Sequence, residues 1–211
     1  MKKDPDPYRL YKRVPERSVL KEPAWIVTKV DGKIASVSTD YRHFAYIAEQ
    51  VAKLPPKSVG AVVTAKLSTE EVVGLAEHAK WDDLRLFGSP FQLKVWKSLY
   101  DLDHSAEDGS LIHTKLYSYS EFSDIRGNPL GVRPVAHAVA MNPVAYIIPC
   151  HLIVPKEAID KIAEISAKAQ DTLFKGRDLY LLDTIDVGEY AYGSALKGRF
   201  IAAQFAISQL G

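Results

Sequence analysis

The tetrapeptide Pro149-Cys150-His151-Leu152 places a thiol next to an imidazole inside the apolar run VAYIIPCHLIV. A free thiol has a pKa of about 8.5 and is only a few per cent thiolate near neutral pH, so a nucleophilic cysteine needs a base or a cation nearby. Neighbours on an extended strand point to opposite faces, so contact between Cys150 and His151 requires a tight turn or a bridging water. Taken alone, the pair is more typical of two core residues than of a catalytic site.

Three segments frame this pair, namely SYSEFSDIRGNPLGVR, AMNPVAYIIPCH and GEYAYGSALKGRFIAAQ. A tyrosine at 119, an arginine fourteen residues later, an Asn-Pro and an Ile-Pro-Cys-His together resemble the O6-alkylguanine-DNA alkyltransferases, also called methylated-DNA-protein-cysteine methyltransferases. The resemblance covers residues 91–211. It implies direct-reversal DNA repair, in which a flipped O6-alkylguanine, or an O4-alkylthymine, transfers its alkyl group irreversibly and stoichiometrically to Cys150.

The resemblance also implies a role for each matching residue. His151 is the general base for Cys150, Tyr119 donates a proton to the leaving purine, and Asn142 braces the turn beneath the site. Gln204 occupies the place of a glutamate that orients the histidine. The remaining pocket positions are Tyr190, Ala191, Lys197, Ile153 and Val154. Neither a metal nor a cofactor is expected.

Arg133 matches the arginine that enters the base stack in place of the flipped nucleotide. The partner is then double-stranded DNA read from the minor groove, and the other expected contacts are Gly131, Val132, Pro134, Ala136, His137 and Arg126. The segment 125–156 contains no Asp or Glu, as a surface that faces phosphates requires. Taken alone, the same segment favours a buried core, since much of it is apolar.

The chain departs from the family pattern at four places. Besides Gln204, Leu152 replaces an arginine and Ala191 replaces a serine, while 39 residues separate Cys150 from Tyr190, so that a helix at 156–170 forms an insertion. An amide orients an imidazole but stabilises its cation less than a carboxylate does. Three alternatives therefore stay open: a module that binds alkylated DNA without efficient transfer, a helix-turn-helix regulator and a thiol hydrolase.

Composition narrows the class of protein further. The 211 residues include 27 basic and 26 acidic side chains, a net charge of +1, and a single cysteine, which excludes an intramolecular disulfide and a multi-thiolate zinc site. No apolar run approaches the roughly 18 residues of a membrane span, and the first residues lack a signal-peptide pattern. We expect a monomer with no membrane partner, cytoplasmic or, in a eukaryote, nuclear.

The sequence predicts two domains, 1–88 and 89–211, which together position the candidate site residues. The first domain begins with a basic, proline-rich arm at 1–23. The rest of it is predicted to be α/β, with a hairpin that turns at Asp31-Gly32, a helix over 44–51, a buried strand in VGAVVTA and a capped helix from Ser68. For this domain, the resemblance implies a ribonuclease-H-like sheet with helices.

The second domain is predicted to be mainly helical, with a winged-helix or helix-turn-helix architecture. Its elements are a helix from Phe91, a polar loop over 101–115, a helix at 118–125, a second one from Asn128-Pro129, an amphipathic helix at 156–170 and a last helix at 194–210. The amphipathic helix presents Ile159, Ile162, Ala163, Ile165 and Ala167.

Overall fold

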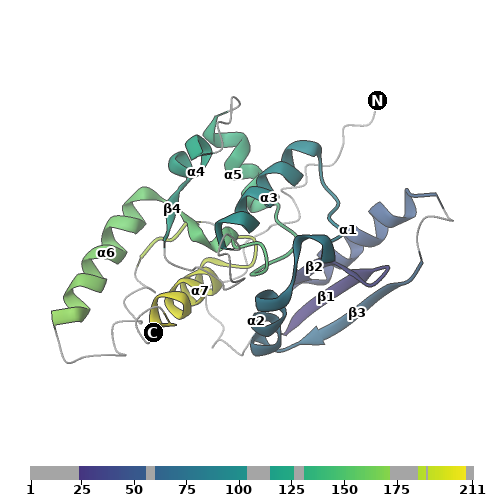
Figure 1. Ribbon diagram of the computed structural model, residues 1–211, viewed down its shortest axis with the longest axis horizontal. Coiled ribbons are helices and arrows are strands. Elements are labelled where there is room, and N and C mark those ends of the chain that lie inside the picture. The colour runs from purple at the N-terminus through teal and green to yellow at the C-terminus, as the bar shows by residue number, and fades with distance from the viewer. Residues whose placement is uncertain are drawn as a thin grey trace.

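The computed structural model describes residues 24–55, 60–103, 115–125, 131–171, 185–188 and 190–207, and side chains within them except at 165–171 and 202–207. The predicted arm at 1–23 and most of the predicted loop at 101–115 lie outside the described residues. A small sheet lies on one side of the molecule, and helices make up most of the rest (Figure 1).

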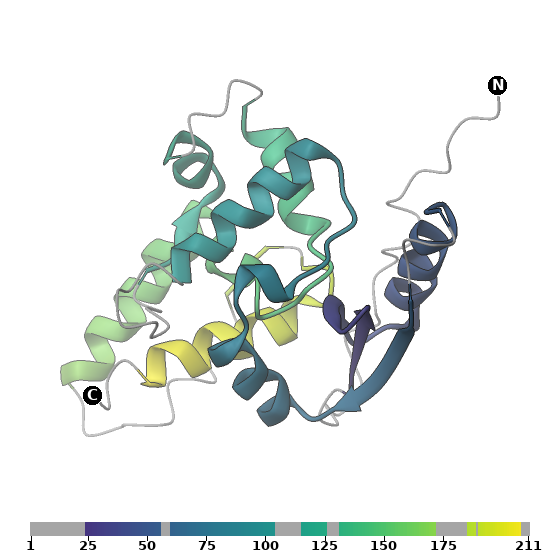
Figure 2. The same ribbon diagram turned by 45° about the vertical axis from the view of Figure 1, so that its right-hand side comes forward.

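The sheet consists of three antiparallel strands in the order β2-β1-β3, with bounds β1 Trp25–Val30, β2 Lys33–Ser38 and β3 Val62–Leu67. Asp31 and Gly32 both have positive φ, at 52° and 78°, which is the backbone that a tight hairpin turn requires. The predicted hairpin is therefore confirmed. Helix α1 (Tyr41–Ala52) covers one face of the sheet and the helical part covers the other (Figure 2).

Helix α2 (Thr69–His78) begins where the sequence predicts a helix start. The Ser68 hydroxyl accepts a hydrogen bond from the Glu71 backbone N–H, and the Glu71 carboxylate accepts one from the Ser68 backbone N–H. This reciprocal capping satisfies two backbone donors that a helix end otherwise leaves unpaired. A short 3-10 turn, η3 (Trp81–Asp83), then leads toward the second half of the chain.

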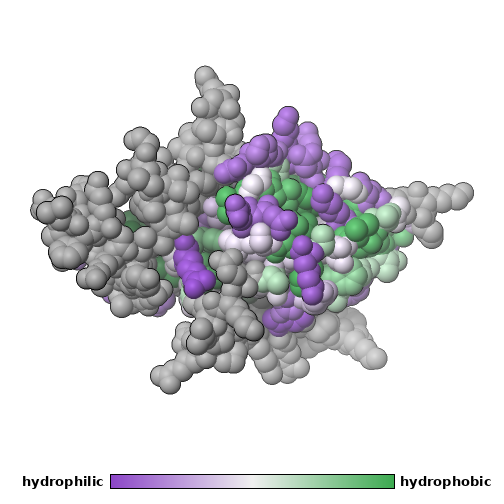
Figure 3. Space-filling model, turned by 90° about the horizontal axis from the view of Figure 1, so that it is seen from below, coloured by the Kyte–Doolittle hydropathy of each residue, from purple (hydrophilic) through white to green (hydrophobic). Residues whose placement is uncertain are grey.

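Strand β3 differs from its prediction, because most of it is exposed and not buried. Within the described residues it pairs only with β1, so it forms an edge of the sheet, and the side chain of Val63 is 56% exposed. Apolar residues reach the surface among hydrophilic ones on the same side of the molecule (Figure 3). An apolar run indicates a strand but does not reveal whether a second layer covers it.

The helical half contains α3 (Pro90–Asp103), α4 (Tyr119–Ile125), α5 (Val132–Ala140), α6 (Lys156–Asp171) and α7 (Ser194–Ile207), with the one-turn η4 (Cys150–Leu152) and the parallel strand pair β4 (Tyr117–Ser118) and β5 (Ile153–Val154). Helix α5 packs against both α3 and α4. Trp96 of α3 is buried and donates its indole N–H to the Ala138 carbonyl of α5 at 2.8 Å.

The start of α5 differs from the prediction. The sequence placed it at Asn128-Pro129, but the helix begins at Val132 after Gly131, whose φ of 81° turns the chain into the helix. Glycine adopts that backbone without steric cost, so Gly131 is the effective start signal. Asn128 and Pro129 themselves lie outside the described residues.

One apolar cluster joins the two halves, and a smaller one lies within the helical half. The larger one joins Trp25 and Val37 of the sheet to Trp96 and to the residues around Cys150. The smaller one lies beneath α6 and consists of Leu116, Leu152, Val154, Ala158, Ile162, Ile185, Val187 and Ile201. The predicted apolar face of α6 is confirmed at Ile162, whereas Ala163 is exposed because it lies about 100° further around the helix, at the margin of that face. Among the described residues, no helix is long and apolar enough to cross a bilayer.

Candidate functional site

The segment 142–150, which we call the nucleophile turn, carries Cys150 at its end. Asn142 folds this segment around its own side chain: Oδ1 accepts from the Val144 N–H at 3.0 Å, and Nδ2 donates to the Ile148 carbonyl at 2.8 Å and to Cys150 Sγ at 3.0 Å. An asparagine that bonds the backbone two residues ahead is a characteristic turn former. The predicted bracing role of Asn142 therefore corresponds to contacts in the structure.

Cys150 is almost fully buried, with 3% of its surface exposed. Burial raises the pKa of its thiol, while hydrogen bonding with Asn142 and Tyr190 and the charge of Lys197 act in the opposite direction. Tyr190 Oη lies 3.9 Å from Sγ. These neighbours would stabilise a thiolate, whereas the low-polarity surroundings alone favour the neutral thiol.

Lys197 is a buried cation beside the thiol. Its Nζ donates to the Ile153 carbonyl at 2.7 Å and faces the rings of Tyr119 and Tyr190 at 5.9 and 6.0 Å. Burial lowers the pKa of Lys197 to about 8, against the attraction of Cys150 and Asp186. At neutral pH this amine is therefore mainly protonated. Four of the predicted site residues lie around it, namely Tyr119, Cys150, Ile153 and Tyr190.

His151 is completely buried next to Cys150 in η4. Its imidazole is stacked on the ring of Tyr146, with centroids 5.5 Å apart and planes inclined by 7°, and it also contacts Phe200 at 5.3 Å. Tyr146 has a φ of 68°, an uncommon backbone for a bulky residue. The aromatic neighbours thus determine the plane of the predicted general base.

Tyr119 follows the short parallel ladder between β4 and β5. Tyr117 pairs with Ile153 and Ser118 with Val154, so the start of α4 lies beside the segment that leaves Cys150. Val154 is buried in the cluster beneath α6. The backbone thereby brings the predicted proton donor and the predicted nucleophile to one region of the molecule.

The predicted DNA-facing residues lie at the start of α5. Gly131, Val132 and Arg133 are exposed, whereas Pro134, Ala136 and His137 are half-buried along the same helix. Arg126 lies outside the described residues, and Gln204 lies in α7 with its side chain outside them. The described part of the chain contains no cluster of three or more His, Cys, Asp or Glu side chains that could hold a metal ion.

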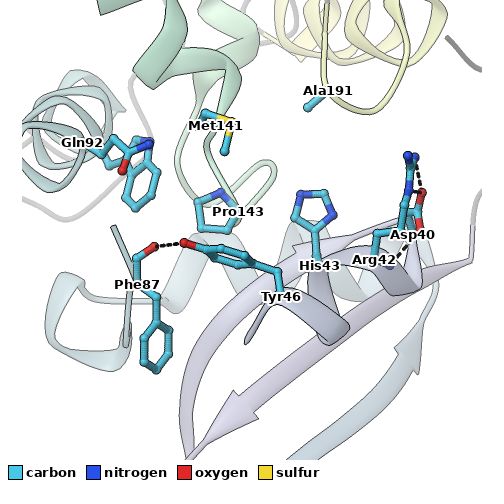
Figure 4. Close-up of a pocket in the computed structure, with 10 residues that line it drawn as sticks. Asp40, Arg42, His43, Tyr46, Phe87, Gln92, Met141, Pro143 and Ala191 are labelled. Carbon is cyan, nitrogen blue, oxygen red and sulfur yellow. Dashed lines mark hydrogen bonds and ion pairs between the residues drawn. The ribbon is translucent and has the colours of Figure 1, made fainter. Parts of the chain in front are cut away.

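Ala191 is not grouped with the thiol but lines a separate pocket, with a volume of about 50 Å³. The pocket lies between α1, α3 and the nucleophile turn, and it is lined by Asp40, Arg42, His43, Tyr46, Phe87, Gln92, Trp96, Met141, Pro143 and Ala191 (Figure 4). Met141 and Pro143 border this pocket, while Asn142 between them contacts Cys150. The turn therefore separates the two regions.

Comparison with known proteins gives a match over this half of the chain. Residues 90–173 match the sequence model of the family described as 6-O-methylguanine DNA methyltransferase, DNA binding domain. The match is confined to this segment. A probable methylated-DNA–protein-cysteine methyltransferase of Acanthamoeba polyphaga mimivirus is 40% identical over 74 residues, which cover 35% of this chain and 44% of the viral protein.

The methylated-DNA–protein-cysteine methyltransferase of Haemophilus influenzae is 36% identical over 70 residues, covering 33% of this chain and 34% of that protein. The chain thus spans less than half the length of these two relatives. Among solved structures, the Mycobacterium tuberculosis O6-methylguanine methyltransferase matches with 30% identity and a TM-score of 0.32, covering 42% of this chain and 48% of that one.

Several residues around the nucleophile turn had no distinctive sequence signal. Tyr146 lies inside an apolar run, and Phe200 lies in the apolar pattern of α7, so each reads as ordinary core. Tyr192, two residues after Tyr190, contacts the nucleophile turn through a hydrogen bond from its hydroxyl to the Asn142 carbonyl at 2.8 Å. Its place two residues after Tyr190 gave no signal, because the Gly193 N–H donates to the Tyr190 carbonyl and the segment is a turn, in which alternate residues need not share a face.

Proposed function

We propose that this protein repairs alkylated DNA by transferring the alkyl group of O6-alkylguanine, and of O4-alkylthymine, to Cys150. The observation that carries the proposal is the surroundings of the single thiol. Sγ is buried, accepts a hydrogen bond from Asn142 at 3.0 Å, and lies next to Tyr190 and the buried Lys197. The family match over residues 90–173 supports the same chemistry.

In the proposed reaction, Cys150 loses its proton to His151 and the thiolate attacks the alkyl carbon. The carbon–sulfur bond forms as the carbon–O6 bond breaks, and the electron pair returns to the purine. Tyr119 supplies a proton, so guanine leaves as a neutral base. The thioether has no route back to a thiol, so each molecule acts once. Gln204 would orient His151.

The proposed substrate reaches the site after base flipping from double-stranded DNA. The exposed start of α5 would face the minor groove, with Arg133 replacing the flipped base and small residues such as Gly131 and Ala136 permitting close approach. Tyr190, Lys197, Ile153 and Val154 would surround the flipped base, whereas Ala191 lines the pocket on the other side of the nucleophile turn. We further propose a monomer, in which 89–211 is a winged-helix or helix-turn-helix domain and 1–88 a ribonuclease-H-like domain.

One experiment tests this function directly. The full chain is incubated with a duplex that carries O6-methylguanine, or with O6-benzylguanine, and peptides are then analysed by mass spectrometry. We expect a stoichiometric mass gain on the peptide that contains Cys150 and none in Cys150→Ser. Tight lesion binding without an adduct would instead indicate a binding module, and neither binding nor adduct would refute the proposal.

A further inference from the structure

The edge of the N-terminal sheet is bonded directly to the nucleophile turn. The Val37 N–H of β2 donates to the Pro143 carbonyl at 3.0 Å, and the Ala145 N–H donates to the Val37 carbonyl at 3.0 Å. These two bonds form a parallel bridge between Val37 and Val144. The turn that carries Cys150 is therefore an extension of the sheet, and the sheet contributes to its position.

Tyr192 makes a second connection between the same parts. It is 8% exposed, and its ring contacts Trp25 of β1 at 6.2 Å and His43 of α1 at 5.5 Å between centroids. His43 is itself held, because its Nδ1 lies 2.8 Å from the Ser38 hydroxyl. The ring of Tyr192 thus contacts Trp25 and His43 of the N-terminal part and the ring of Tyr190, 5.2 Å away, while its hydroxyl donates to the Asn142 carbonyl at 2.8 Å.

Asn142 links Tyr192 to the sulfur atom of Cys150. Its backbone carbonyl accepts from Tyr192, and its side chain donates to Cys150 Sγ. A donor held toward sulfur stabilises the thiolate more than the thiol, and the benefit depends on how firmly the donor is positioned. We propose that Tyr192, fixed by Trp25 and His43, is a positioning residue that keeps the Asn142 amide on Cys150.

This inference deepens the proposed alkyl transfer and takes its biological meaning from it, but it can be tested without DNA. The chain has one cysteine, so the rate of reaction with iodoacetamide as a function of pH reports the ionisation of Cys150 alone. The groups that face this thiol are Asn142 of the turn, Tyr190 of the segment before α7, Lys197 of α7 and the adjacent His151. They are unchanged in each variant.

The central variant is Tyr192→Phe, which keeps the enclosed ring and removes only the donor to Asn142. We expect alkylation at pH 7.5 to slow by about threefold to tenfold, the range that loss of one hydrogen bond produces. The midpoint of the pH profile should rise correspondingly, by about half a unit to one unit. His43→Leu, which removes the ring beside Tyr192, should move the midpoint in the same direction by a smaller amount.

Tyr100→Phe is the matched control. Tyr100 is also 8% exposed and donates to a backbone carbonyl, that of Ala79, at 2.9 Å, but it lies away from the nucleophile turn. We expect it to lower the melting temperature about as much as Tyr192→Phe while leaving the pH profile unchanged. An unchanged profile in Tyr192→Phe, or an equal displacement in Tyr100→Phe, would overturn the proposal.

The same samples separate this inference from the proposed function. If the wild-type protein takes no methyl group from O6-methylguanine DNA, the alkyl transfer fails, and the iodoacetamide profiles still decide whether Tyr192 positions the thiol. If transfer occurs and the Tyr192→Phe profile matches the wild type, the function stands and the positioning role is wrong.

Discussion

The ring of Tyr146 lies parallel to the imidazole of His151, 5.5 Å away. Replacing it by leucine removes the ring–ring contact, so His151 gains rotational freedom and accepts the Cys150 proton less efficiently. We expect Tyr146→Leu to slow alkyl transfer by about tenfold, in line with a contact worth up to 1.5 kcal/mol. Tyr146→Phe keeps the stack and should retain most of the rate. Single-turnover transfer from an O6-methylguanine duplex measures both, and equal losses in the two variants would exclude a stacking role.

Lys197 supplies a positive charge next to the thiol only while it is protonated. Since burial lowers its pKa to about 8, this charge is present at pH 7 and is lost as the pH rises through 8. We expect Lys197→Met to react more slowly than the wild type at pH 7 and to approach the wild-type rate above pH 9. Iodoacetamide kinetics across that range measure the effect, with the exposed Lys156→Met as the charge control. Parallel profiles at all pH values would contradict this account.

His43 links stability to pH because burial lowers its pKa to about 4, from 6.5, despite the nearby Asp40. Between these two values the unfolded chain binds more protons than the folded one, so stability rises with pH. The free energy of unfolding should therefore fall by up to on the order of 3 kcal/mol as the pH drops from 6.5 to 4. Urea unfolding of wild type and His43→Gln compares the slopes. The exposed His78→Gln should retain the wild-type slope.

Arg133 is exposed at the start of α5, where we propose that it replaces the flipped base. Arg133→Ala should reduce the rate of transfer from duplex DNA by at least tenfold, because the vacated stack is no longer filled. Transfer from free O6-benzylguanine needs no flipping and should change less than twofold. Lys66→Ala, on β3, removes the same charge elsewhere and controls for non-specific attraction. A similar loss on both substrates would indicate a damaged site.

The elements around the site were largely predictable because each carries its own local signal. Asp31-Gly32 defines the hairpin, the Ser68 capping pattern starts α2, and the apolar spacing of α3 and α6 predicts their buried faces. The predicted start of α5 was wrong by several residues, because the sequence offered both an Asn-Pro signal and a glycine, and the helix begins after the glycine, whose φ is positive.

The arrangement of the site was predictable only where the family motif supplied it. Asn142 and Cys150, whose side chains are in contact, are eight residues apart in the sequence, and Lys197 and Ile153 are 44 apart. The spacing of apolar residues along the chain gives no information on contacts across such separations. Leu152 shows the opposite case. In the sequence it is only the replacement of an arginine, whereas in the structure it packs in the apolar cluster beneath α6. An apolar residue at 152 therefore fits the presence of the inserted helix.

The two-residue ladder of β4 and β5 fixes the spacing between Tyr119 and Cys150 through backbone atoms, not through side chains. A ladder this short opens locally, and its opening exposes the backbone amides to solvent exchange. When closing is faster than exchange, the amide exchange rates across this ladder report the equilibrium between its closed and open forms. The fraction of molecules in which the ladder is closed sets an upper limit on the fraction in which the site is assembled.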